Sequence, residues 1–173
     1  GKCGSLENAR IMFNTLPKRN VVSWSSLIAG CTRYGDDLLA LQLFTDMHKE
    51  GIMPDRVSYL NVLPACGNVG GIQEGMWIYN KVIWNNLESD IIIGSTLVDM
   101  YVKCESIHEA RATFDRLEMR DIVTWGTMMH GYVIHKQCLN AFQLFETMKM
   151  CGLIPNTIIF ECLLEACNVL EAI

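Results

Sequence analysis

Cysteine and histidine are the residues of this sequence best suited to metal binding or nucleophilic chemistry. The chain has eight cysteines and four histidines, and thiolates and imidazoles are the usual zinc ligands and common nucleophiles. No two cysteines form a C-x-x-C pair, and no cysteine–histidine set has zinc-ligand spacing. His130 and His135 are five positions apart, which misses the i, i+4 spacing of a shared helical metal site. We therefore predict no metal, no cofactor and no catalytic residue, and we interpret the cysteines as reduced packing residues, with a disulfide framework as the alternative.

An internal repeat sets the elements that must position any functional side chain. Residues 20–31 read Asn-Val-Val-Ser-Trp-Ser-Ser-Leu-Ile-Ala-Gly-Cys, and residues 121–132 repeat that phrase as Asp-Ile-Val-Thr-Trp-Gly-Thr-Met-Met-His-Gly-Tyr. The same offset of 101 positions relates residues before and after these two segments. The chain divides into units of 35, 35, 31 and 35 residues that begin at residues 21, 56, 91 and 122. Self-similarity at such periods predicts a repeat architecture.

Each unit has the apolar periodicity of two helices. The first helix has apolar residues at i, i+3, i+4 and i+7, beginning at Trp24 in the first full unit. The second begins that spacing with a small residue, Ala40, followed by larger ones, and Gly51 and Pro54 end it. Because a pair of short helices cannot bury its apolar surface alone, we predict an all-α fold, an α-solenoid of helix-turn-helix repeats in a right-handed superhelix. We expect its Trp, Phe and Met side chains to form the core.

The composition fits a folded repeat array and gives no sign of a membrane protein. Half of the 173 residues are hydrophobic, 19% are charged, and the net charge is −5, which excludes the disordered class and does not favour nucleic acid by charge alone. No apolar run is long enough to span a bilayer. Because Gly1 falls inside a repeat, we interpret the sequence as part of a longer chain. Apolar helix faces at its two ends are then a hypothetical contact between copies.

These units resemble pentatricopeptide repeats, and their successive lengths of 35, 35 and 31 residues resemble the plant P-L-S subclass. Residues 21–30 and 51–55 are similar to its P-type unit, residues 61–66 to its L-type unit and residues 97–104 to its S-type unit. The resemblance assigns a partial S-type repeat to residues 1–20, P-type repeats to 21–55 and 122–156, an L-type repeat to 56–90, an S-type repeat to 91–121 and a partial L-type repeat to 157–173.

The resemblance implies binding of single-stranded RNA, with one base per repeat. In this family the fifth and last residues of each unit read the base, the second residue sandwiches it, and the thirteenth contacts phosphate. For base recognition this implies Asn20, Ser25, Asp55, Leu60, Asp90, Ser95, Asp121, Gly126 and Asn156. For the base sandwich it implies Val22, Val57, Ile92, Val123 and Ile158, and for phosphate contact Lys2, Arg33 and Lys103.

The chemistry of these pairs predicts a short base register. A carboxylate accepts from the ring N–H of guanine or uracil, and a small Ser leaves room for a purine, so Ser25 with Asp55 favours guanine. Gly126 with Asn156 resembles adenine-preferring pairs, and Leu60 cannot hydrogen-bond. We predict guanine, any base, guanine and adenine, 5′ to 3′ along the chain from N to C. Helix capping is the alternative role for an Asp at a unit boundary.

Among whole-protein functions, the resemblance implies an organellar RNA-processing factor, in the mitochondrion or chloroplast, that recognises C-to-U editing sites. RNA-editing accessory proteins are the further partners that it suggests, and it suggests no membrane. A deaminase needs H-x-E followed by P-C-x-x-C. His108 and Glu109 are adjacent, so we predict that the chain is not an enzyme. The alternative is a helical-repeat protein–protein scaffold of the tetratricopeptide kind within an editing assembly, against which stand the 35-residue period and the missing Trp-x-x-Leu-Gly pattern.

Overall fold

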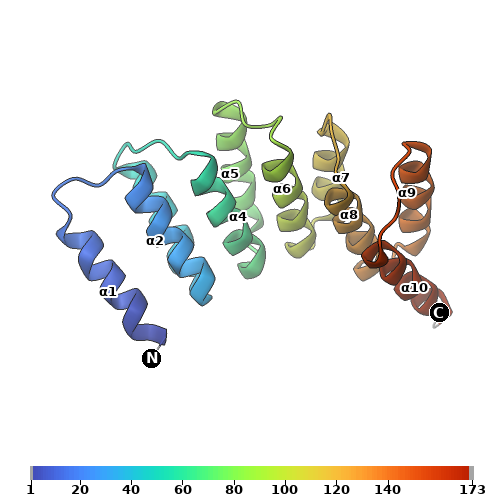
Figure 1. Cartoon of the computed structure of the whole chain (residues 1–173), viewed down its shortest axis with the longest axis horizontal. Helices are drawn as coiled ribbons and strands as arrows, with labels where there is room; N and C mark the ends of the chain where they lie inside the picture. The colour runs from blue at the N-terminus through green and yellow to red at the C-terminus, as the bar shows by residue number, and fades with distance from the viewer. Residues whose placement is uncertain (1, 172–173) are drawn as a thin grey trace. The chain divides into compact units, whose positions relative to one another are not determined.

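The chain folds into consecutive α-helices joined by short turns (Figure 1). In this computed structural model the backbone of residues 2–171 and the side chains of residues 6–171 are described. Within residues 2–171 every regular element is an α-helix, which confirms the predicted all-α class. The helices are α1 (Lys2–Thr15), α2 (Val21–Tyr34), α3 (Asp37–Lys49), α4 (Arg56–Val69), α5 (Ile72–Trp84), α6 (Ile91–Lys103), α7 (Ile107–Arg116), α8 (Ile122–Ile134), α9 (Cys138–Met150) and α10 (Thr157–Glu171).

The helices form two compact units, one up to Leu87 with α1–α5 and one from Glu88 with α6–α10. We call α2, α4, α6, α8 and α10 first helices and the others second helices. In the first unit α2 packs on both α3 and α4, and α3 also packs on α4. In the second unit α6, α7 and α8 form the same triangle, and α8, α9 and α10 repeat it. Helices α3, α7 and α9 are thus each wedged between two consecutive first helices, as in the predicted α-solenoid.

The turn within each helix pair has one backbone conformation. Its fifteenth-position residue is left-handed in four successive pairs: Gly35 (φ 80°), Gly70 (φ 68°), Glu105 (φ 57°) and Lys136 (φ 58°). Glycine adopts this region without a Cβ penalty, whereas Glu and Lys do not. The last two turns therefore keep the geometry at a cost in strain.

Aromatic contacts join four second helices to the first helix that follows: α1 to α2, α3 to α4, α7 to α8, and α9 to α10. Phe13 of α1 meets Trp24 of α2 edge to face, with ring centroids 4.7 Å apart. The same contact recurs between Phe44 and Tyr59 at 5.7 Å, Phe114 and Trp125 at 5.0 Å, and Phe145 and Phe160 at 6.2 Å. Edge-to-face pairs add to the free energy of burial because the ring edge is positive and the face negative.

The expectation that all Trp, Phe and Met side chains are core was too broad. Trp84 is 80% exposed in the last turn of α5, and Met150 is 80% exposed in the last turn of α9. Both lie beyond the apolar quartet of their helix, so no neighbouring helix covers them. Cys151 and Cys167 are also exposed rather than packed. Cys3 and the termini lie outside the residues whose side chains are described.

The strained turns predict a stabilising substitution. Lys136→Gly should raise the free energy of unfolding by about 0.5–1 kcal/mol, because glycine removes the left-handed strain of an exposed residue and loses only part of that gain to chain entropy. Urea denaturation followed by circular dichroism measures it. Gln143→Gly, in the exposed middle of α9, is the matched control and should lower stability by about 1 kcal/mol. Destabilisation by Lys136→Gly would contradict the strain argument.

Candidate nucleic-acid interface

The residue before each first helix caps that helix. The first backbone N–H groups of a helix have no partner within it, and a side-chain oxygen just ahead of them supplies one. The Oδ1 atom of Asp121 accepts from the Thr124 N–H at 2.8 Å, and that of Asn156 accepts from the Ile159 N–H at 3.1 Å. Asn20, Asp55 and Asp90 cap α2, α4 and α6 in the same way. The five predicted last-position residues are therefore all caps.

At Asp55, Asp121 and Asn156, capping uses the Oδ1 atom of the side chain, and the second terminal atom takes no part in the cap. At Asp55 and Asp121 the cap bonds converge on Oδ1, and no group in the described part of the chain bonds Oδ2. At Asn156 the oxygen must face the helix to accept, so the Nδ2 amino group is the remaining atom. An Asp cap therefore offers an acceptor to a ligand, and an Asn cap offers a donor.

An exposed aliphatic side chain lies in the first turn of every first helix. The exposed fractions are 65% for Val22, 52% for Val57, 54% for Ile92, 60% for Val123 and 67% for Ile158. Such residues are normally buried, and here the same position stays exposed in each helix. Because successive first helices pack side by side within each unit, these side chains form an apolar row beside the caps. They are the residues predicted to sandwich bases.

The first predicted base-reading pair is brought together, but its hydroxyl is already engaged. Ser25 Oγ lies 3.5 Å from Asp55 Oδ1. The single Ser25 hydroxyl proton has two acceptors at 2.8 Å, the Val21 carbonyl and Ser58 Oγ, and Ser25 is only 4% exposed. Ser58 in turn donates to Asp55 Oδ1 at 2.7 Å. In this structure Ser25 therefore provides space beside Asp55 and holds its carboxylate in place, rather than presenting a free donor.

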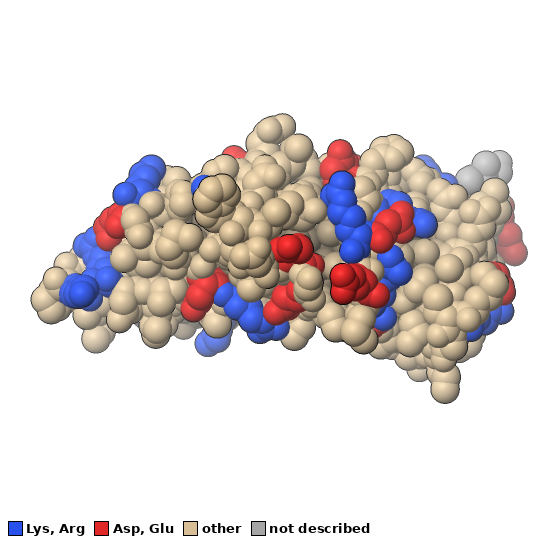
Figure 2. All heavy atoms as spheres, turned by 90° about the horizontal axis from the view of Figure 1, so that it is seen from above, with Lys and Arg blue, Asp and Glu red and all other residues tan. Residues whose placement is uncertain are grey.

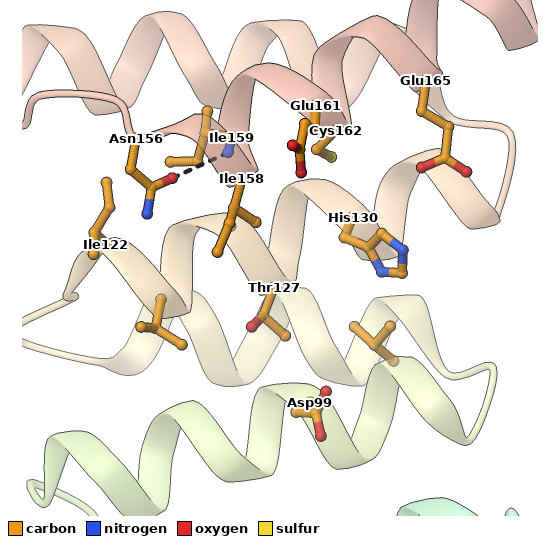
Figure 3. Close-up of a pocket in the computed structure, with 13 residues that line it drawn as sticks. Asp99, Ile122, Thr127, His130, Asn156, Ile158, Ile159, Glu161, Cys162 and Glu165 are labelled. Carbon is orange, nitrogen blue, oxygen red and sulfur yellow. Dashed lines mark hydrogen bonds between the residues drawn. The ribbon is translucent and has the colours of Figure 1, made fainter.

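The fourth predicted pair lines an open cavity of about 370 Å³ formed by α6, α8 and α10 (Figure 3). Val123, Gly126, Asn156 and Ile158 all line it. Figure 3 shows the Asn156 oxygen turned to the Ile159 N–H and its amide nitrogen turned toward α8. A Cβ added at Gly126 would meet only the Ile159 side chain, at 3.8 Å. The cavity therefore combines the apolar side chains of Val123 and Ile158, the Asn156 amino group as a donor, and room for a large planar group.

The other two predicted pairs are Leu60 with Asp90 and Ser95 with Asp121. Leu60 and Asp90 lie in different compact units, and each is partly exposed. Ser95 of α6 and Asp121 at the start of α8 lie on two packed helices, and no hydrogen bond joins their side chains in the described structure.

The predicted phosphate contacts are sparse. Arg33 is exposed in the last turn of α2. The Lys103 ammonium forms an ion pair with Asp99 Oδ2 at 2.8 Å, which offsets its charge. The Lys2 side chain lies outside the described residues. On the face drawn in Figure 2, basic and acidic side chains lie beside one another rather than in a basic stripe.

Several further cavity residues were not predicted to take part. Thr127 and His130 of α8 and Asp99, Cys162 and Glu165 line it, as does the fifth-position Glu161. Val123, Gly126, Thr127 and His130 follow the i, i+3, i+4, i+7 spacing of one helix face, which is the signal that could have identified α8's contribution.

Burial, with a smaller effect from Glu165, raises the pKa of the Cys162 thiol to about 11, so this thiol stays neutral. Glu161 and Glu165 thus bring two carboxylates to the lining of the cavity.

Comparison with protein families identifies this arrangement. A model of the PPR repeat family matches residues 19–68 and 120–168, and a PPR repeat model matches residues 95–122. The chain belongs to the pentatricopeptide repeat (PPR) family. Its described side chains include no group of three or more His, Cys, Asp or Glu residues arranged to hold a metal ion, and none of its described helices has the length and apolarity to cross a bilayer.

Known PPR proteins match nearly the whole chain. It is 36% identical to a pentatricopeptide repeat-containing protein of Arabidopsis thaliana over 167 aligned residues. The alignment covers 96% of this chain and 21% of the relative. It is 38% identical over 157 residues to a mitochondrial pentatricopeptide repeat-containing protein from the same plant. That alignment covers 91% of this chain and 25% of the relative. The crystal structure of the pentatricopeptide repeat protein PPR10 in complex with an 18-nt psaJ RNA element matches with a TM-score of 0.80 at 20% identity, over 97% of this chain and 26% of that one. The chain thus spans about a quarter of the length of these PPR proteins.

The capping role predicts which substitutions at the PPR unit boundary affect folding. Asp121→Ala should lower the free energy of unfolding by about 1 kcal/mol, because the backbone N–H and the hydroxyl of Thr124 lose their acceptor. Asp121→Asn should change it by only a few tenths of a kcal/mol, since Asn caps as well as Asp. Thermal and urea unfolding of the three proteins measures both effects. Equal stability of the Ala variant and the wild type would show that Asp121 does not cap in solution.

Proposed function

We propose that this chain is a sequence-specific, single-stranded RNA-binding module that takes one base per repeat and has no catalytic activity. The observation that carries the proposal is the pairing, at the start of α4, α8 and α10, of a cap that uses only one terminal atom with an exposed aliphatic side chain. Planar bases stack on such aliphatic side chains, and the free cap atom lies where it can meet a base edge. The RNA complex of PPR10, whose fold this chain shares, supports the same assignment.

Asp and Asn caps should select different bases. The free Oδ2 of Asp55 or Asp121 accepts a hydrogen bond, which suits the ring N–H of guanine or uracil. The small neighbours Ser25 and Ser95 leave room for the larger ring, so both units favour guanine. The free Nδ2 of Asn156 donates, which suits adenine N1 or cytosine N3, and the space beside Gly126 favours adenine. With Leu60 unable to discriminate, the proposed register is guanine, any base, guanine, adenine.

Electrostatics should make the binding weak and selective rather than strong. Phosphate neutralisation usually dominates nucleic-acid affinity, yet the net charge is −5 and Glu161 and Glu165 line the cavity. Arg33, Lys103 and Lys2 are the proposed phosphate contacts. With few such contacts, base stacking and cap hydrogen bonds must supply most of the binding free energy.

A second candidate is a protein–protein scaffold within an RNA-editing assembly. The acidic lining of the cavity and the apolar fifth residue Leu60 favour this alternative, because neither suits contact with RNA. For the parent protein we propose recognition of C-to-U editing sites in a mitochondrion or chloroplast, with the P-L-S repeat types described above. The mitochondrial relative supports an organellar location.

The experiment that tests the proposal is fluorescence anisotropy at low salt with short single-stranded RNAs. RNA with a guanine-any-guanine-adenine core should bind more tightly than scrambled RNA, and Asp121→Asn should move the third-position preference from guanine to adenine by roughly tenfold, or about 1.4 kcal/mol. The change replaces an acceptor by a donor while leaving the cap and the fold in place.

Asp36→Asn is the matched control. Asp36 caps the second helix α3, where its side chain accepts from the Leu39 N–H at 3.3 Å. The chemical change is identical, but it lies away from the row of exposed aliphatic residues, so the base preference should not move. Equal binding of all RNAs, or an equal shift in the control, would contradict base reading by the first-helix caps and favour the scaffold.

A further inference from the structure

A cavity of about 390 Å³ lies between the second helices α1 and α3, beside the part of α2 on which both pack. Within the described residues α1 and α3 do not pack on each other. The gap between them is lined by apolar side chains from all three helices, including Phe13, Leu27 and Leu43. None of the described residues proposed to contact RNA lines it. This α1/α3 cavity is therefore a separate surface, and it belongs to the first compact unit alone.

The charged side chains of the α1/α3 cavity leave one positive charge without a partner. Arg19 Nη1 pairs with Glu50 Oε1 at 2.7 Å, and Lys49 Nζ pairs with Asp46 Oδ1 at 3.0 Å. All four groups line the cavity, and Arg10 lines it as well. Arg10 is exposed, and no described side chain forms a hydrogen bond or an ion pair with it. The guanidinium of Arg10 is thus the one uncompensated charge among the described residues that line this cavity.

Arg10 lies close enough to Cys31 of α2 for its charge to act on that thiol. Burial, with a smaller effect from Asp36, raises the pKa of the Cys31 thiol to about 11, and the Arg10 charge acts in the opposite direction. Because its pKa is so high, the thiol stays neutral at physiological pH. Cys31 therefore gives Arg10 no negative charge to pair with.

The equivalent arginine of the second unit does have partners. Arg111 Nε donates to Asp115 Oδ1 at 2.9 Å and Oδ2 at 2.8 Å, and Arg111 Nη1 donates to Tyr132 Oη at 3.1 Å. The residues 101 positions before these two partners are Asn14 and Cys31, and neither supplies a charge. Arg10 is therefore unpaired because its two partners are replaced within α1 and α2.

We propose that the α1/α3 cavity binds a segment of another protein that places one carboxylate on Arg10 and apolar side chains beside Leu39 and Leu43. A guanidinium and a carboxylate match in both charge and geometry, so a Glu or Asp side chain would complete Arg10 as Asp115 completes Arg111. Asp46 and Glu50 line the same cavity and repel a polyanion such as nucleic acid, whereas a single carboxylate can reach Arg10 alone. This binding does not depend on RNA binding by the first helices.

An NMR titration of the ¹⁵N-labelled chain tests the proposal, with the indole N–H of Trp24 as the reporter. Trp24 lines the cavity, and its indole N–H is buried without a hydrogen-bond partner among the described residues, as is that of Trp125 in the second unit. The probe is an end-blocked Leu-Glu-Leu peptide, and the control probe is Leu-Gln-Leu. At millimolar concentration Leu-Glu-Leu should shift the Trp24 resonance and leave that of Trp125 unmoved. Leu-Gln-Leu should bind roughly fivefold more weakly, which is the scale of one partly exposed ion pair.

Two variants place the carboxylate at Arg10. Arg10→Gln keeps a long polar side chain but loses the charge, so it should bind both peptides equally. Asn14→Asp restores the acid that Arg111 has at i+4, which occupies Arg10 from within the chain, so it should also weaken Leu-Glu-Leu binding roughly fivefold. The matched control Arg111→Gln should bind both peptides as the wild type does. Circular dichroism should give equal helix content for all variants.

Three results would overturn the assignment to a protein segment. The first is an unmoved Trp24 resonance with Leu-Glu-Leu, and the second is equal binding of the two peptides by the wild type or unchanged selectivity in Arg10→Gln. The third is a larger Trp24 shift with short single-stranded RNA than with Leu-Glu-Leu, which would assign the α1/α3 cavity to a phosphate instead.

Discussion

Every first helix of this chain requires a hydrogen-bond acceptor ahead of its first turn, and the proposed site depends on that requirement. The backbone N–H groups at a helix start have no internal partner, so an Asp or Asn side chain must turn one oxygen toward them. Once Asp121 or Asn156 has done so, the direction of its second terminal atom is fixed. A structural need of the helix thereby orients the polar atom that we propose to read the base. The same bond predicts that Asp and Asn can be exchanged there with little cost to folding.

The remaining features of the repeat hold these caps in register. Edge-to-face contacts such as Phe13 with Trp24 and Phe114 with Trp125 fix α2, α4, α8 and α10 against the second helix that precedes each of them. A residue in the left-handed conformation then gives the turn of each helix pair the same geometry. Lys136 adopts this conformation with strain, because it is not a glycine. Because each pair of helices has the same geometry, the exposed aliphatic residues from Val22 to Ile158 recur beside the caps.

Much of this fold could be predicted from the sequence, because helical periodicity and repeat equivalence are properties of the chain itself. The spacing that begins at Trp24 and the Gly51 and Pro54 stop signal both match the helix bounds of the structure. The site was less predictable. The burial of Ser25 depends on Ser58 from the next first helix, and the acidic lining of the cavity depends on α6, α8 and α10 together. The exposure of Trp84 and Cys167 likewise depends on which neighbouring helix covers them, which periodicity within one helix does not show.

The most direct measurement of the central claim is an NMR titration of ¹⁵N-labelled chain with short single-stranded RNA. The side-chain amide of Asn156 and the backbone N–H of Ile159 report on the two ends of one cap. We predict that RNA shifts the Asn156 Nδ2–H₂ resonances, while the Ile159 N–H stays protected from exchange with solvent because its hydrogen bond to Oδ1 is kept. Unchanged Asn156 side-chain resonances, with shifts confined to the second helices α7 and α9, would contradict the account.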